Sequence, residues 1–268
     1  MKRLDYLQQK LPHSLHKTGM LEGPELSVCS ILHTLAASHL NSPIARKSGF
    51  KSSNSLPFTR VNILGTPAAL NVPGARQASM SFIDTSGSFW VFGGFDLDSK
   101  GNPDALNDLW QFKAGAWTWM SGANVVNQTG VYGTQGVAAS TNVPGARWSS
   151  GAWSDASGNL WIFGGEGYDS VGNGSLSDVW EFKGGQWIWV KGPASVSQGG
   201  IYGLAPGPII YPYVGNGPGS RFAPGYWYVL NPTDNSVEFW VFGGEGFDSA
   251  GANGNGLLSD LWRYLPYP

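Results

Sequence analysis

The sequence predicts an all-β protein, most of which consists of about three copies of a four-stranded antiparallel sheet. Composition is the first indication, because 39 Gly, 13 Trp and a charged fraction of 13% differ from the Ala-, Glu-, Lys- and Leu-rich chains of long helices. Internal repetition is the second, since short motifs return in the same order at intervals of about 70 residues. The chain before residue 61 contains none of these motifs.

Each repeat begins with an arginine, continues with an aromatic run closed by a glycine pair, and then has an Asp-[Leu/Val]-Trp core. The first two repeats add a Trp-x-Trp. In order, the copies are Arg76, Arg147 and Arg221; 89–94, 160–165 and 239–244; 106–112, 176–182 and 258–264; and, for Trp-x-Trp, 117–119 and 187–189. The constant order indicates that each copy is one structural unit.

The strands are easiest to place in the second repeat. Apolar, β-branched and aromatic runs predict them at about 148–154, 159–164, 177–183 and 186–191. Two hairpin signals, Asp-Ala-Ser-Gly at 155–158 and Gly184-Gly185, join the first to the second and the third to the fourth. The pair Gly164-Gly165 is expected to end the second strand. A four-stranded meander repeated about an axis is a blade of a β-propeller.

On these motifs the chain resembles the kelch-repeat β-propellers, in particular the long-blade propellers grouped with galactose oxidase. The resemblance covers residues 61–264 and implies a propeller fold, but propellers serve many functions. In peptide-binding members, arginines placed like Arg76, Arg147 and Arg221 hold acidic side chains of the ligand, and the forked guanidinium suits carboxylates. The resemblance therefore implies an acidic protein or peptide ligand.

Three copies make a partial ring, because closed propellers have four to eight blades. The third copy also stops before a Trp-x-Trp. Three completions are open at this point: the chain is a fragment; residues 1–60, or the stretch 58–65, supply a strand; or two chains form a six-bladed ring. The homodimer is the preferred prediction, because unpaired strand edges are unfavourable.

The connectivity of a meander locates a candidate site. With strands A to D, the B–C and D–A connections lie at the same end of a blade, and both are expected to be long. Long loops on a rigid scaffold often carry binding sites. The candidate ligand-binding residues at this end are Arg76, Arg147, Arg221, Tyr132, Tyr202, Glu166, Tyr168, Asp169, Glu245, Phe247 and Asp248.

Structural roles are the alternative for the same residues. Each arginine bridges, in this interpretation, to an aspartate of a B–C loop and stabilises its blade. The loop carboxylates, such as Asp169, are expected to cap their own turns rather than to bind calcium, so no metal site is predicted. The recurring tryptophans are expected in the blade core.

Enzymatic functions are restricted by the residues present. Residues 61–268 contain neither His nor Cys, which excludes from them a copper-radical oxidase resembling galactose oxidase and a Ser–His or Cys–His nucleophile. The predicted function is a non-catalytic scaffold that binds a protein or peptide without a cofactor. The alternatives are a carbohydrate-binding propeller and, more distantly, a sialidase-like glycoside hydrolase, suggested by Asp155-x-x-Gly158-x-x-Trp161.

The chain divides into a basic extension and linker, 1–60, of net charge +5, and the repeats, 61–268, of net charge −7. Pro24-Glu25 and the apolar residues after them predict the start of a helix, while a targeting role and the localisation stay open. The overall charge of −2 argues against nucleic-acid binding. No stretch reaches the ~18 apolar residues of a membrane span.

Overall fold

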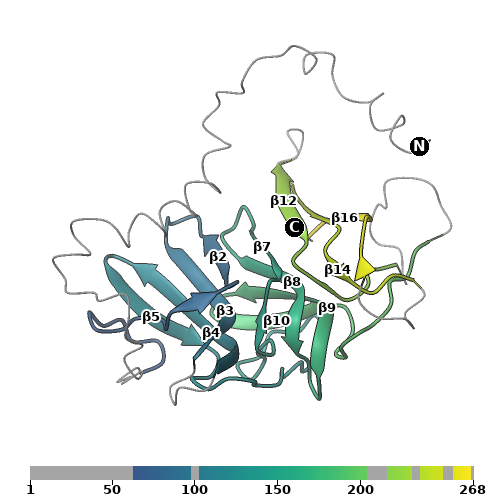
Figure 1. Ribbon diagram of the computed structural model, residues 1–268. Coiled ribbons are helices and arrows are strands. Elements are labelled where there is room, and N and C mark those ends of the chain that lie inside the picture. Colours follow the sequence, from purple (N-terminus) through teal and green to yellow (C-terminus); the bar gives the residue numbers. More distant parts are fainter. Residues whose placement is uncertain (1–62, 98–102, 204–215, 231–235, 250–255, 267–268) are drawn as a thin grey trace, which may run out of the picture. The chain divides into compact units, whose positions relative to one another are not determined.

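The computed structural model describes residues 63–97, 103–203, 216–230, 236–249 and 256–266, shown as the coloured ribbon in Figure 1. These residues form an all-β protein with several antiparallel sheets and no helix. The predicted extension 1–60, with its helix start, lies outside them. A search of the same residues finds no helix with the length and apolar character needed to cross a membrane.

The first two repeats each form one antiparallel sheet. The first has β1 (Arg76–Gln77), β2 (Met80–Ile83), β3 (Phe89–Leu97), β4 (Pro103–Lys113) and β5 (Ala116–Ser121). The second has β6 (Arg147–Trp148), β7 (Gly151–Ser154), β8 (Leu160–Tyr168), β9 (Asn173–Lys183) and β10 (Gln186–Lys191). The predicted first strand is divided in two, because the chain bends at Ala78 and Ser149, where φ is 53° and 54°. Both parts pair with the next strand, so each sheet is four strands wide.

The prediction that Gly164-Gly165 ends the second strand is wrong. Pairing of β8 with β9 changes register between Phe163 and Gly165 and then continues to Tyr168, because the glycines form a β-bulge that only turns the strand. The B–C connection of this repeat is therefore short. A methyl group at Gly164 would lie 2.8 Å from the carbonyl oxygen of Arg221, so the missing side chain lets two neighbouring repeats approach closely.

The third repeat is divided between two small sheets. One contains β11 (Arg221–Phe222), β14 (Glu245–Gly246) and β15 (Gly256–Leu257), and the other contains β12 (Gly225–Leu230), β13 (Val237–Phe242) and β16 (Leu261–Tyr264). β16 pairs with β13 along one edge. No described strand pairs with its other edge, which corresponds to the edge of β9 that carries β10.

The segment before each of the first two sheets lies along the fourth strand of that sheet. The Gly65 N–H donates to the Trp119 carbonyl oxygen at 2.8 Å, and the Gly136 N–H donates to that of Trp189 at the same distance. The prediction that 58–65 completes the third repeat is therefore wrong for Gly65, which hydrogen-bonds to the fourth strand of the first repeat. Residues 58–62 lie outside the described residues.

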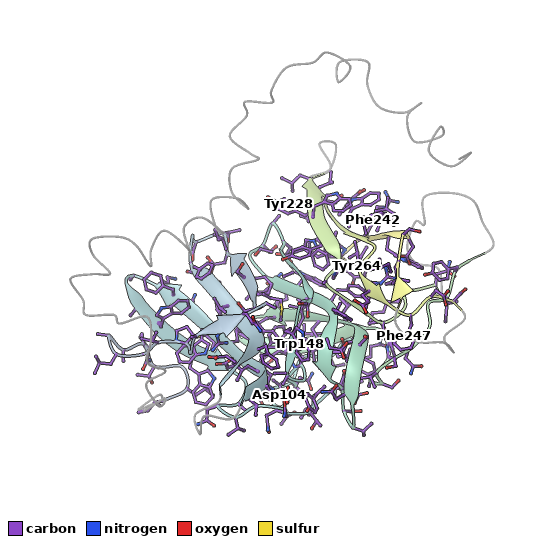
Figure 2. All side chains as sticks on the ribbon, in the orientation of Figure 1. Asp104, Trp148, Tyr228, Phe242, Phe247 and Tyr264 are labelled. Carbon is purple, nitrogen blue, oxygen red and sulfur yellow. The ribbon has the colours of Figure 1, made fainter. Side chains whose placement is uncertain are left out.

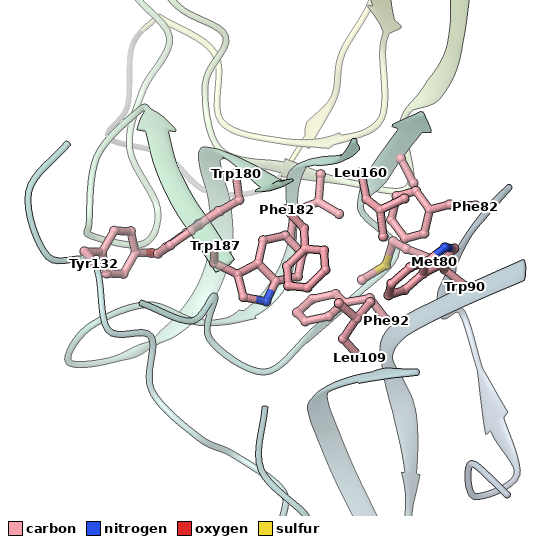
Figure 3. Packing of buried hydrophobic residues seen from close by; sticks show 12 residues of the cluster. Met80, Phe82, Trp90, Phe92, Leu109, Tyr132, Leu160, Trp180, Phe182 and Trp187 are labelled. Carbon is pink, nitrogen blue, oxygen red and sulfur yellow. The ribbon is translucent and has the colours of Figure 1, made fainter. Parts of the chain in front are cut away.

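Consecutive sheets pack face to face through two apolar clusters. Figure 3 shows the first, which joins Met80, Phe82, Trp90, Phe92 and Leu109 of the first repeat to Leu160, Trp180, Phe182 and Trp187 of the second. The second cluster joins Trp153, Trp161 and Phe163 of the second repeat to Val237, Phe239, Val241 and Trp262 of the third. The prediction that the recurring tryptophans lie in the core is confirmed for those that belong to these clusters, Trp90, Trp153, Trp161, Trp180, Trp187 and Trp262.

The outer face of the third repeat is uncovered within the described residues. All six residues of β12 are exposed, and Phe242, labelled with Tyr228 in Figure 2, is 48% exposed. Trp227 is 42% exposed, whereas Trp153, at the same place in the second repeat, is 6% exposed. The difference arises because the third repeat covers Trp153, and the Trp153 indole N–H donates to the Trp227 carbonyl oxygen at 2.9 Å.

Candidate functional site

Each repeat arginine forms a two-pronged ion pair with the aspartate of its Asp-[Leu/Val]-Trp motif. In the second repeat, the Arg147 guanidinium donates to the two carboxylate oxygens of Asp178 at 2.6 and 2.8 Å. Arg76 and Asp108 do the same at 2.7 and 3.0 Å, as do Arg221 and Asp260 at 2.6 and 2.7 Å. The pair therefore recurs in all three repeats.

The arginines lie inside the sheets rather than at a ligand-accessible surface. Their side chains are 6, 0 and 0% exposed for Arg76, Arg147 and Arg221. Arg147 also donates to the carbonyl oxygens of Gly145 and Gly164. Each of its three guanidinium nitrogens therefore donates a hydrogen bond within the protein. Burial alone would lower the pKa of Arg147, but the Asp178 carboxylate raises it above its ordinary value.

The expected bridge to an aspartate of a B–C loop is not the one that forms. Asp169 of that loop instead accepts hydrogen bonds from the backbone N–H groups of Val171, Gly172 and Val196, each at 2.6 Å. Arg147 reaches Asp178 because β6 pairs with β8, and β8 pairs with β9, which carries Asp178. Strand order thus decides which carboxylate each arginine meets.

The two loop tyrosines make the same hydrogen bond but differ in their exposure to solvent. Tyr132 and Tyr202 donate from their hydroxyl groups to Asp178 and Asp260, both at 2.7 Å. Tyr132 is 6% exposed, while Tyr202 is 40% exposed. Burial and the Asp178 charge raise the pKa of Tyr132, and burial with the hydrogen bond to Asp260 raises that of Tyr202 to about 12.

The remaining candidates lie in β8 and in or directly after β14. Glu166 and Tyr168 are in β8 and Glu245 is in β14, whereas Phe247 and Asp248 follow β14. Glu166 accepts a hydrogen bond from the Ser175 hydroxyl at 2.7 Å. Burial raises its pKa, and the nearby Glu245 charge adds to the effect. Within the described residues, no group of three or more His, Cys, Asp or Glu is arranged to hold a metal ion.

An apolar groove of about 320 Å³ lies between the sheet of the second repeat and that of β12, β13 and β16. One wall is formed by Trp153, Trp161, Phe163 and Val179, and the other by Phe239, Val241, Trp262 and Tyr264. The other lining residues include the polar side chains of Ser177, Lys191, Gln198, Asn216 and Arg263 and the loop residues Ile201 and Pro218. Burial lowers the pKa of Lys191 to about 8.

The groove occupies the place that a tryptophan fills one repeat earlier. Between the first two sheets, the Trp187 ring of β10 lies 5.1 Å from the ring of Phe92 and 5.1 Å from that of Phe182. The same places in the next interface belong to Phe163 and Tyr264, both of which line the groove. Figure 3 shows Trp187 beside Phe92 and Phe182. The groove therefore lies at the position that corresponds to that of Trp187 in the preceding interface.

Comparisons with known proteins do not identify a family for this chain. The sequence matches no protein-family model, and no curated protein matches it. Among solved structures it is similar to that of YjhT, with a TM-score of 0.36 and 12% sequence identity over 72% of this chain and 45% of YjhT. The chain thus spans less than half the length of that protein, and a likeness of this size carries no argument about the fold or the site.

Sequence reasoning missed the aspartate partners and the groove. The signal for Asp108, Asp178 and Asp260 was present, since each precedes the recurring [Leu/Val]-Trp. The groove had a weaker signal: the equivalents of both aromatic neighbours of Trp187 are present one repeat later, as Phe163 of the second repeat and Tyr264 of the third. Their meeting depends on how two sheets pack, which no local pattern specifies.

Proposed function

We propose that this protein is a non-catalytic kelch-type β-propeller scaffold that binds a protein partner. The repeat motifs and the face-to-face packing of successive antiparallel sheets support the propeller. The observation that carries the binding function is the aromatic groove between the second and third repeats. The proposed binding site is this groove rather than the arginines, because the three guanidinium groups are held in internal ion pairs.

The shape and chemistry of the groove favour a polypeptide segment. Its walls are aromatic and aliphatic, and an apolar side chain that enters it exchanges water for ring contacts. Beside it runs an edge of β16 that no described strand pairs with, and an extended peptide satisfies such an edge through main-chain hydrogen bonds.

Selection from a library of random displayed peptides tests this function with the full chain. We expect the selection to enrich peptides that bind the wild-type protein. The affinity of these peptides for the Ile201→Trp variant should be lower by more than about tenfold. Ile201 lines the groove and is 59% exposed, so the larger side chain can obstruct it without replacing a core residue.

The matched control is Val131→Trp. Val131 occupies the position of Ile201 one repeat earlier and is 46% exposed, but there Trp187 fills the interface. Peptides selected on the wild-type protein should bind this variant normally. Failure to enrich any peptide that competes for the groove would count against the proposed function.

A further inference from the structure

We draw no further inference here: the strongest candidate, the apolar groove between the sheet of the second repeat and the sheet of β12, β13 and β16, belongs to the binding site already proposed, and nothing among the described residues shows what occupies it.

Discussion

Arg147 and Asp178 form a two-pronged ion pair in which neither side chain has any exposed surface. Asp178 also accepts hydrogen bonds from the Trp180 indole and the Tyr132 hydroxyl, both at 2.7 Å. The carboxylate thus joins β6, β9 and the loop before β6. The same group of four residues recurs in the third repeat, with Arg221, Asp260, Trp262 and Tyr202.

Loss of this arginine should strongly destabilise the fold. Arg147→Met leaves the buried Asp178 charge without its cation, and breaking a buried ion pair in this way costs about 3–5 kcal/mol. Urea denaturation measures the change. Lys183→Met, at an exposed lysine, serves as the control and should change the free energy of unfolding by less than about 0.5 kcal/mol. A loss below about 1 kcal/mol in Arg147→Met would contradict this account.

Removing the Tyr132 hydroxyl should cost more stability than removing that of Tyr202. Tyr132→Phe deletes a buried hydrogen bond to a charged group, for which about 1.5–3 kcal/mol is typical. Tyr202→Phe deletes the same bond where the ring is 40% exposed, so solvent replaces part of it. The free energies of unfolding of the two variants test this order. Equal losses would show that solvent exposure does not determine how much each hydroxyl group contributes to stability.

Gly164→Ala should be more destabilising than Gly184→Ala, although the two glycines have almost the same φ, 62° and 58°. Both substitutions incur the left-handed backbone penalty of roughly 1–2 kcal/mol. Only at Gly164 would the new methyl group lie 2.8 and 2.9 Å from carbonyl oxygens, those of Arg221 and Leu176. Chemical denaturation measures the free energies of unfolding of the two variants. Equal losses would show that the close contact at Gly164 does not contribute to the cost of the substitution.

Lys191 should make stability increase with pH above about 8. Burial lowers its pKa from 10.5 to about 8, so between these values the unfolded chain binds a proton that the folded chain does not. The free energy of unfolding therefore rises with pH in this window. Denaturation at pH 7.5 and 9.5 should show a smaller increase for Lys191→Met than for the wild type. Parallel pH profiles would mean that the amine is well solvated.

The exposed face of the third repeat leads to a prediction about assembly. Successive sheets pack face to face, and the uncovered Trp227 and Phe242 match residues that are buried one repeat earlier. Light scattering of the full chain should therefore give twice the monomer mass of 28.6 kDa, as a six-bladed ring of two chains requires. Phe242→Glu should yield monomers, and Val171→Glu, at a turn residue that is 85% exposed, should not. A monomeric wild type would remove the homodimer.

The sequence by itself determined the all-β class, the repeat boundaries and most strand positions. Strands such as Gln186–Lys191 could be placed because their signals are local: alternating apolar residues and the glycine turn before them. The bulge at Gly164 was not predicted, because a glycine pair is compatible both with a strand end and with a bulge, and hydrogen bonding to β9 decides between them.

Only the tertiary structure decided what the candidate residues contact. The second repeat offers Arg147 several aspartates, including Asp155, Asp169 and Asp178, and the order of β6, β8 and β9 selects the last of them. The groove, likewise, exists because Phe163 and Tyr264 of separate sheets face the same space. Local patterns specify how a strand forms, whereas ion pairs and cavities depend on contacts between residues distant in the chain.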